Sequence, residues 1–320
     1  MDIQEALARC NKHIDSALAS AGSGFNAVTS YLSQSKGKGV RSLLLLTAAA
    51  DLEGNVHEDA CLAAAAIELL HMATLVHDDV MDDAPTRRGI PSLHKKFDVK
   101  TAVICGDYLL SLSLSMLADM DKQRTEKIKE YVPLIPKLSR ALSSVCKGEY
   151  GQHVNNGNLD MSLLTYLRII SGKTAALFFI SAYAGAMLSD AASADEAMAI
   201  GRYGRCLGMI FQIADDCKDY EWTEEMAMKP VGNDIKTGVI TLPLIFALRK
   251  NPALKSIAKE VLTGQRSHAH FVQALRGTDG LEAAREVSAR YAAWGEQALR
   301  GIDAKKKAAL LHILYGIKGV

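Results

Sequence analysis

The sequence predicts an all-α protein, and three features of the chain support this. Of its 320 residues, 49% are hydrophobic but only 6% are aromatic, which favours Ala- and Leu-rich helices over aromatic β-strands. Apolar residues recur at helical spacing along most of the chain. No useful stretch alternates apolar and polar residues, and there is no low-complexity tract or short-period repeat. No linker divides the chain, so we expect a single all-helical domain over residues 1–320.

The N-terminal half is expected to alternate helices with short loops. Apolar spacing predicts a first helix over 3–18, which stops at the glycines near residue 22. Residues 35–41 form a basic, glycine-containing loop that enters an apolar run over 42–50, and backbone amides at such a helix start favour anions. A long apolar helix over 59–83 should end before Pro85. Another helix follows over 100–120.

The C-terminal half continues the helical pattern. We expect helices over 131–151, 162–189 and 194–219, with loops at 155–158 and around Asp190. Residues 228–234 read as a loop, after which 242–249 resumes helix. Residues 251–320 are expected to form further helices broken at glycines.

Two aspartate clusters of the same form interrupt these apolar helices. Carboxylates at positions i, i+1 and i+4 span roughly a 100° arc of a helix, so each cluster is expected to present its charges on one face. Buried charges persist when they are paired or bind metal, and ligand sets made only of oxygen suit Mg²⁺, which shares its coordination with phosphates and waters. The clusters therefore predict that a diphosphate is held through metal. The first comprises Asp78, Asp79 and Asp82, and the second Asp215, Asp216 and Asp219.

Cationic residues cluster around both acidic segments. His71 is expected on the same helical face as Asp78, about 10 Å away along the helix axis. A lone His on a core helix is, however, as often a structural residue. Arg87 and Arg88 follow the first cluster and form either a salt-bridged cap or a second anion site. Lys173 and Thr174 are expected at a helix start, where they either address a phosphate or simply cap the helix. Together the cations suffice for more than one polyanion: Lys38, Arg41, His71, Arg87, Arg88, Lys173 and Lys229.

The net charge and the first residues of the chain indicate which partners and which cellular location to expect. The formal net charge of +1 gives no global field that would attract nucleic acid or an acidic membrane, so no nucleic-acid partner is expected. The first residues lack a basic segment followed by an apolar one, which predicts no secretory signal and a cytoplasmic location. The longest uncharged stretch, 174–189, is shorter than the ~20 residues of a spanning helix, so we expect no transmembrane segment.

At the two acidic segments the chain resembles a known family. Residues 69–82 followed by Arg87-Arg88-Gly89, together with residues 211–219, resemble the trans-type polyprenyl diphosphate synthases, and the likeness runs from about Lys36 to Leu244. Two such motifs in order are far more specific than one. The resemblance implies an all-α, isoprenoid synthase-type helical bundle around a central cavity. It also implies a homodimer, about three Mg²⁺ ions, condensation of isopentenyl diphosphate with an allylic diphosphate, and transient membrane contact for product release.

Matching positions imply a role for each candidate residue. Asp78 and Asp82 would bind two Mg²⁺ ions and Asp215 a third, with further direct or water-mediated contacts. The remaining metal-site residues are Asp79, Asp216, Asp219 and Asp234. The residues implied to be catalytic, at the allylic diphosphate, are Lys173, Thr174, Gln212 and Lys229, with Arg87 also binding that diphosphate. The residues implied to bind isopentenyl diphosphate are Lys38, Arg41, His71 and Arg88.

The chain departs from the family pattern at three positions within the matched segments, and its C-terminal Tyr315-Gly316-Ile317-Lys318 lacks the arginine seen in some relatives. Gly39 and Ser42 stand where the loop usually has arginine and proline, and Val239 stands where many members have lysine. These changes predict altered isopentenyl diphosphate binding, and they leave open a non-catalytic subunit of a heteromeric synthase as an alternative. A terpene cyclase is less favoured because Asp215, Asp216 and Asp219 replace the mixed Asn, Ser or Thr and Glu motif of that class.

The length of the product is expected to depend on the residues just before the first cluster. By the resemblance, bulky aromatics there form a floor for the growing chain, whereas here Ala73 and Thr74 are small. We therefore expect a medium or long product, about hexaprenyl to nonaprenyl. A farnesyl or geranylgeranyl product, with ordinary helix packing at Ala73 and a floor elsewhere, is the alternative.

Overall fold

The computed structural model describes residues 1–34, 37, 39–128, 131–189, 192–221 and 233–318, and most of these residues are helical, with only two short strands among them. This confirms the predicted fold class. The first part of the chain forms α1 (Ile3–Ala19), α2 (Asn26–Ser33), α3 (Val40–Ala49), α4 (Glu58–Met81), the strands β1 (Thr86–Arg87) and β2 (Ile90–Pro91), α5 (Leu93–Lys96), α6 (Val99–Lys127) and α7 (Ile135–Asn155). The second part forms α8 (Leu163–Ile170), the π-helical turn η1 (Ser171–Ala175), α9 (Ala176–Met187), α10 (Ala194–Glu221), α12 (Asn233–Thr237), α13 (Leu242–Lys250), α14 (Leu254–Leu262), α15 (His268–Arg276), α16 (Gly280–Ala298) and α17 (Ala304–Lys318).

The described chain separates into two compact units, and we treat each by itself. Unit 1 comprises 1–139, 180–201 and 301–310, and unit 2 comprises 140–179, 202–300 and 311–320. The expectation of a single domain stays a prediction.

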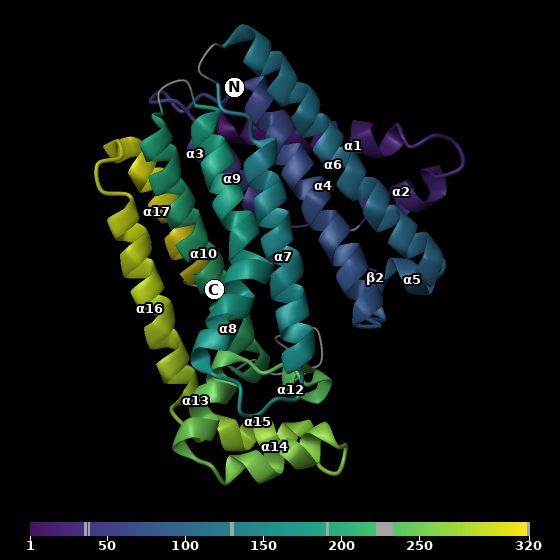
Figure 1. Ribbon diagram of the computed structural model, residues 1–320, viewed down its shortest axis with the longest axis vertical. Coiled ribbons are helices and arrows are strands. Elements are labelled where there is room, and N and C mark those ends of the chain that lie inside the picture. The colour runs from purple at the N-terminus through teal and green to yellow at the C-terminus, as the bar shows by residue number, and fades with distance from the viewer. Residues whose placement is uncertain (35–36, 38, 129–130, 190–191, 222–232, 319–320) are drawn as a thin grey trace. The chain divides into compact units, whose positions relative to one another are not determined.

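Unit 1 is built on the long helix α4, which lies beside α6 (Figure 1). Ala66 accepts a hydrogen bond of 2.6 Å from the Ser113 hydroxyl, and a Cβ at Gly106 would lie 2.2 Å from the His77 ring. Ala66, Ala73 and His77 are spaced by seven and four residues and so share one helical face, which is the face towards α6. The small Ala73, only 2% exposed, therefore packs where α4 meets α6.

The two acidic residues at the start of α4 and the turn that ends it explain its bounds. Glu58 and Asp59 lie in the first turn, where negatively charged carboxylates interact favourably with the helix dipole. The helix ends at Met81, with Asp82 as the C-terminal cap residue and Asp83 in the left-handed region at φ 48°. A short antiparallel β-hairpin follows, which the sequence pattern did not predict because each strand has only two residues.

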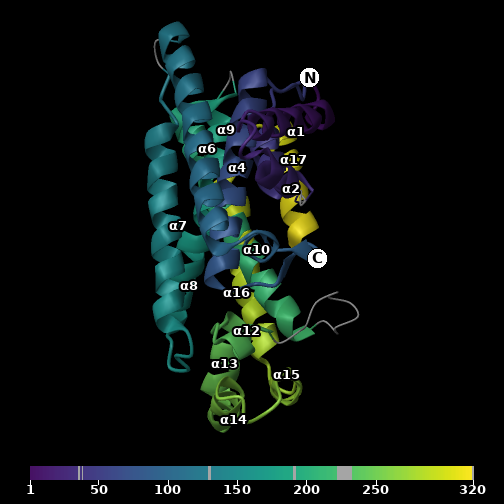
Figure 2. The ribbon, with the colours of Figure 1, turned by 90° about the vertical axis from the view of Figure 1, so that its right-hand side faces the viewer.

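Unit 2 has its own apolar core between α8, α10 and the helices that follow. Large side chains such as Tyr220 and Phe271 are fully buried, as are Leu242 and Leu244 at the start of α13. Both views of the ribbon show α13, α14 and α15 gathered together (Figures 1 and 2). This core holds α10, which carries the second acidic cluster.

One local prediction is wrong. Lys173 and Thr174 do not begin a helix: α8, η1 and α9 are contiguous from Leu163 to Met187, and these two residues lie inside the π-helical turn. A π-turn widens the helix by one residue and is often found at functional sites. Any anion binding by Lys173 and Thr174 therefore cannot come from a helix N-terminus.

Within the part of the chain that the structure describes, three helical segments are long and apolar enough to cross a membrane by length and composition alone: Glu58–Met81, Val99–Lys127 and Leu163–Met187. Burial inside the protein differs among them, at 61% of the apolar window of the first but only 33% of that of Val99–Lys127. The first also ends in the acidic cluster, which is costly in a bilayer. The absence of a transmembrane segment stays a prediction.

Candidate active site

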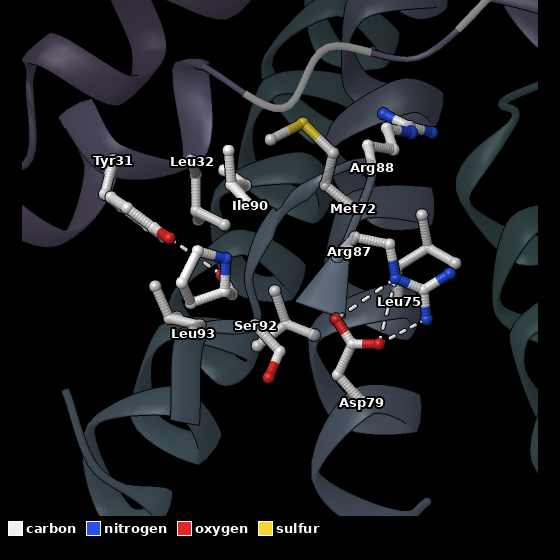
Figure 3. Close-up of a pocket in the computed structure, with 12 residues that line it drawn as sticks. Tyr31, Leu32, Met72, Leu75, Asp79, Arg87, Arg88, Ile90, Ser92 and Leu93 are labelled. Atoms are coloured by element: carbon white, nitrogen blue, oxygen red, sulfur yellow. Dashed lines mark hydrogen bonds and ion pairs between the residues drawn. The ribbon is translucent and has the colours of Figure 1, made fainter. Parts of the chain in front are cut away.

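In unit 1, the first acidic cluster divides into carboxylates with different surroundings. Asp79 is only 4% exposed, whereas Asp78 is half-buried and Asp82 is exposed. Nε of Arg87 donates to both carboxylate oxygens of Asp79, at 2.9 and 3.1 Å, and Nη2 adds a third contact. Figure 3 shows the Arg87 guanidinium facing Asp79 while Arg88 points away. The cluster therefore does not present three equivalent charges on one face, as the sequence had suggested.

The hairpin that carries Arg87 encloses a pocket beside Asp79 (Figure 3). Its walls are mostly apolar, with Met72, Leu75 and Val76 from α4 facing Leu32 of α2 and Ile90 of β2. Apolar walls lower the local dielectric and so strengthen the Arg87–Asp79 pair. Arg87 of β1 is thus salt-bridged to the first acidic helix, and its role at the allylic diphosphate stays a prediction.

A second basic group of unit 1 surrounds His71. Nη1 of Arg41 lies 2.9 Å from Nε2 of His71, and because a guanidinium only donates, Nε2 must accept and Nδ1 must carry the proton. Nδ1 is buried with no hydrogen-bond partner among the described residues. Burial, followed by the charges of Arg41, Arg88 and Arg87, holds the pKa of His71 well below its usual value. The site therefore offers a neutral N–H donor among cations, which suits a phosphate oxygen.

Gly37, Gly39 and Ser42 are the described residues that show the surroundings of the basic segment. A Cβ at Gly37 would lie 2.5 Å from Nη2 of Arg88, so glycine lets the backbone approach this guanidinium closely, whereas a side chain here would require the flexible Arg88 tip to shift. Gly39 adopts φ 60°, a left-handed conformation that an arginine at this position would adopt at a cost. Ser42, where proline is usual, donates to Glu68 at 3.1 Å. Two of the three departures thus have local structural reasons.

The protonation of His71 predicts how pH affects stability. Because its pKa is lower in the folded than in the unfolded chain, the unfolded chain binds a proton first as the pH falls below about 6.5, and the folded state loses about 1.4 kcal/mol per pH unit from this group. We expect the free energy of unfolding of the wild type to fall more steeply from pH 7 to pH 5.5 than that of His71→Gln. Glutamine can accept from Arg41 without titrating. Urea unfolding at several pH values measures this, and parallel curves for the two proteins would contradict it.

In unit 2, the second acidic cluster is similarly divided. Asp215 is exposed, whereas Asp216 and Asp219 are 5% and 6% exposed. Asp216 accepts from the Tyr166 hydroxyl at 2.6 Å and from Nε2 of Gln212 at 2.8 Å, and Asp219 accepts from the backbone N–H of Asp234 at 3.0 Å. Burial, with smaller contributions from the charges of Asp215 and Asp219, raises the pKa of Asp216 to about 7. Asp215 is therefore the member of the cluster that is most open to a ligand.

Lys173 and Thr174 take part in separate contacts of unit 2. Nζ of Lys173 lies 2.7 Å from Oε2 of Glu149 and 3.3 Å from Oε1 of Gln152, both on α7. The Thr174 hydroxyl donates to Oε1 of Gln212 at 2.6 Å. The Thr174–Gln212 bond joins two of the predicted catalytic residues, while Lys173 contacts two residues that the sequence did not indicate, Glu149 and Gln152. Only their spacing of three residues on one helix could have indicated a shared face.

The structure leaves some predicted residues and distances untested. Lys38 and Lys229 lie outside the described residues. Asp78 belongs to unit 1 and Asp215 to unit 2, so the shared cavity stays a prediction. The roles implied for each residue stay predictions as well.

The carboxylates present suit Mg²⁺. Asp78, Asp82 and Asp215 offer hard oxygen ligands at half-buried or exposed positions. Within the described ranges, no three His, Cys, Asp or Glu side chains form a metal cluster on their own.

Comparison with known proteins identifies the class to which this fold and site belong. The polyprenyl synthetase family profile matches residues 23–276. Heptaprenyl diphosphate synthase component 2 of Bacillus subtilis is 37% identical over 265 residues, covering 82% of this chain and 72% of that protein. The chain therefore belongs to the polyprenyl synthetase family and is a trans-type prenyltransferase. This family uses isopentenyl diphosphate and an allylic diphosphate and generally depends on Mg²⁺.

Solved structures agree with this assignment. Heptaprenyl diphosphate synthase from Staphylococcus aureus is 30% identical, with a TM-score of 0.89, and the match covers 100% of this chain and 99% of that one. A polyprenyl synthase from Caulobacter crescentus CB15, solved with calcium and isoprenyl diphosphate, is 28% identical with a TM-score of 0.86, covering 98% and 95% of the two chains. The fold of this chain is thus that of solved heptaprenyl and polyprenyl diphosphate synthases.

Proposed function

We propose that this chain extends an allylic diphosphate with isopentenyl units to a medium- or long-chain all-trans polyprenyl diphosphate, about hexaprenyl to nonaprenyl. The observation that carries the length is Ala73, a small buried residue on the face of α4 towards α6, five residues before Asp78. Two similar proteins named as heptaprenyl diphosphate synthases support it. Thr74 lies one residue nearer the aspartates, and its hydroxyl donates to the backbone oxygen of His71 at 2.8 Å.

The proposed chemistry needs no protein nucleophile. The bond between the allylic carbon and the diphosphate oxygen breaks, the isopentenyl double bond attacks the resulting cation, and a proton leaves to the departing diphosphate. Arg41, His71 and Arg88 would hold isopentenyl diphosphate, and Arg87, Lys173 and Gln212 the allylic diphosphate. About three Mg²⁺ ions, held by Asp78, Asp82 and Asp215, would supply charge neutralisation for the leaving group.

The test is mass analysis of products made by the purified chain from isopentenyl diphosphate, an allylic primer and Mg²⁺. Wild type should release products of about six to nine isoprene units, while Ala73→Leu should give shorter ones, because the added carbons fill space that the tail needs. Ala66→Leu is the matched control: it places the same side chain on the same face about 10 Å farther from Asp78 and should shorten the product less. A farnesyl or geranylgeranyl end point for wild type, or an unchanged length for a folded Ala73→Leu, would sink the proposal.

A heteromeric assembly is a second candidate, favoured by the word "component" in the name of one relative. In this form the chain would act only with a partner subunit, rather than as the homodimer that the resemblance implies. Chain extension by the isolated protein would reject the requirement for a partner. The cytoplasmic location is likewise a proposal, to be tested by fractionation of cells.

A further inference from the structure

A continuous line of hydrogen-bonded side chains in unit 2 includes one residue that no motif contains. The Tyr166 hydroxyl of α8 lies 2.6 Å from Oδ2 of Asp216, whose Oδ1 accepts from Nε2 of Gln212 at 2.8 Å. Oε1 of Gln212 in turn accepts the Thr174 hydroxyl at 2.6 Å. Tyr166 and Thr174 lie on one contiguous helical segment, and Asp216 and Gln212 lie on α10. The four side chains therefore form a bracket between these helices, beside the π-helical turn.

The direction of each bond follows from the chemistry of the groups. In its ionised form Asp216 accepts at both oxygens, so it fixes Nε2 of Gln212 towards itself and turns Oε1 of Gln212 towards Thr174. Oε1 can only accept, so the Thr174 hydroxyl must donate its hydrogen there. The lone pairs of Oγ1 and the second N–H of Gln212 then have defined orientations. Reversing the amide would instead set an N–H against a hydroxyl that must accept, and would lose the bond to Asp216.

The Tyr166 hydroxyl holds the Asp216 carboxylate, and through it the Gln212 amide, in this orientation. Its side chain is 2% exposed, and Asp216 and Thr174 are 5% and 6% exposed, so water does not readily replace a missing donor. Without the hydroxyl, Oδ2 of Asp216 would lose its donor, and only the bond from Gln212 to Oδ1 would oppose rotation about the terminal torsion, which is broad for aspartate. The Gln212 amide would then lose the fixed acceptor that holds its orientation.

We infer that Tyr166 is a positioning residue for prenyl transfer, acting through Asp216 and Gln212 to orient the Thr174 hydroxyl, a role that rests on the function proposed above. Tyr166 itself does not need to touch substrate or metal. Asp216, on this view, serves as an acceptor within the protein, while the exposed Asp215 is the one that binds metal. The hydroxyl should therefore affect turnover more than binding.

The chain offers a closely matched control in Tyr131. Its hydroxyl donates to Oδ1 of Asp121 at 2.6 Å, and Asp121 is 5% exposed, but this pair lies in unit 1 and contains no predicted site residue. Tyr166→Phe and Tyr131→Phe thus remove the same bond to a buried aspartate. Both should lower the melting temperature. Only Tyr166→Phe should lower kcat, by about 10- to 100-fold, as is common when the partner of a site ligand is removed, with little change in KM for either diphosphate.

Two further measurements separate positioning from packing. In a double-mutant cycle, Tyr166→Phe should cost far less in the Thr174→Val background than in wild type, because the same interaction has already been lost. In protein labelled with ¹⁵N-glutamine, the side-chain amide signal of Gln212, identified by its loss in Gln212→Leu, should shift in Tyr166→Phe and stay in place in Tyr131→Phe.

The outcomes distinguish this inference from the proposed function. Equal kcat losses for the two tyrosine variants, additive losses in the cycle, or an unshifted Gln212 signal would each overturn the role of Tyr166. A wild-type protein that makes no polyprenyl product would instead overturn the proposed function, and the amide signal would still report whether Tyr166 orients Gln212.

Discussion

Asp82→Asn is expected to lower kcat/KM by about 10²- to 10³-fold at limiting Mg²⁺, the effect typical of removing one preorganised charge from a reacting group, while leaving stability almost unchanged. Asp82 is exposed at the end of α4, and a surface substitution of this kind usually changes the free energy of unfolding by less than about 0.5 kcal/mol. Raising the Mg²⁺ concentration should recover part of the lost activity, because the remaining carboxylates still attract the ion.

Asp79→Asn is the matched comparison, since it makes the same chemical change three residues earlier. Asp79 is bonded to Arg87, and the two side chains are 6% and 36% exposed. Breaking a fully buried ion pair costs about 3–5 kcal/mol, but the partly exposed Arg87 can be rehydrated, so we expect about 2 kcal/mol. Asp79→Asn should therefore lower both stability and activity.

Activity across a range of Mg²⁺ concentrations and urea unfolding measure the two effects. Equal losses of stability for Asp79→Asn and Asp82→Asn would contradict the division of the cluster into a buried and an exposed carboxylate. Full activity of Asp82→Asn at limiting Mg²⁺ would remove that residue from the metal site.

The sequence predicted the helices and the acidic segments well, because both depend on local pattern. Apolar spacing located α1 and α10 to within a few residues, and the repeated motif led to the family. The sequence also placed all the aspartates of each cluster on one face, and this was too coarse. Neighbouring residues on a helix differ by about 100°, which is enough to turn Asp79 and Asp216 into the protein beside Asp78 and Asp215.

The partners of the site residues could not be predicted in the same way. Tyr166 and Glu149 contact Asp216 and Lys173 across 50 and 24 positions of sequence, and nothing in the local pattern of either residue indicates such a contact. The π-helical turn was missed because its residues continue an ordinary apolar helical pattern. The close approach of this turn to α7 was missed as well, because it depends on two glycines in different helices.

Gly148→Ala is expected to have the largest effect on stability because it blocks this approach. A Cβ at Gly148 would lie 2.2 Å from the backbone N of Lys173 and 2.8 Å from the backbone O of Ile169, and one at Gly172 would lie 2.6 Å from the backbone O of Ser144. Backbone atoms cannot rotate away as a side chain can, so α7 must move from η1. We expect a loss of about 3 kcal/mol or more, at or above the upper end of overpacking costs.

Gly151→Ala on the same helix provides the control, because its Cβ would meet only Cγ1 of Ile169, at 3.2 Å. That side chain can adjust, and alanine favours the helix by about 1 kcal/mol over glycine, so the two effects should nearly cancel. Activity should likewise fall in Gly148→Ala and change little in Gly151→Ala. A shift of the π-helical turn by even ~1 Å would move Lys173 and Thr174 and cost about 10²-fold in kcat, whereas Gly151→Ala should stay near wild type. If Gly148→Ala proved as stable and active as Gly151→Ala, the close approach of α7 would not be what fixes Lys173 in the site.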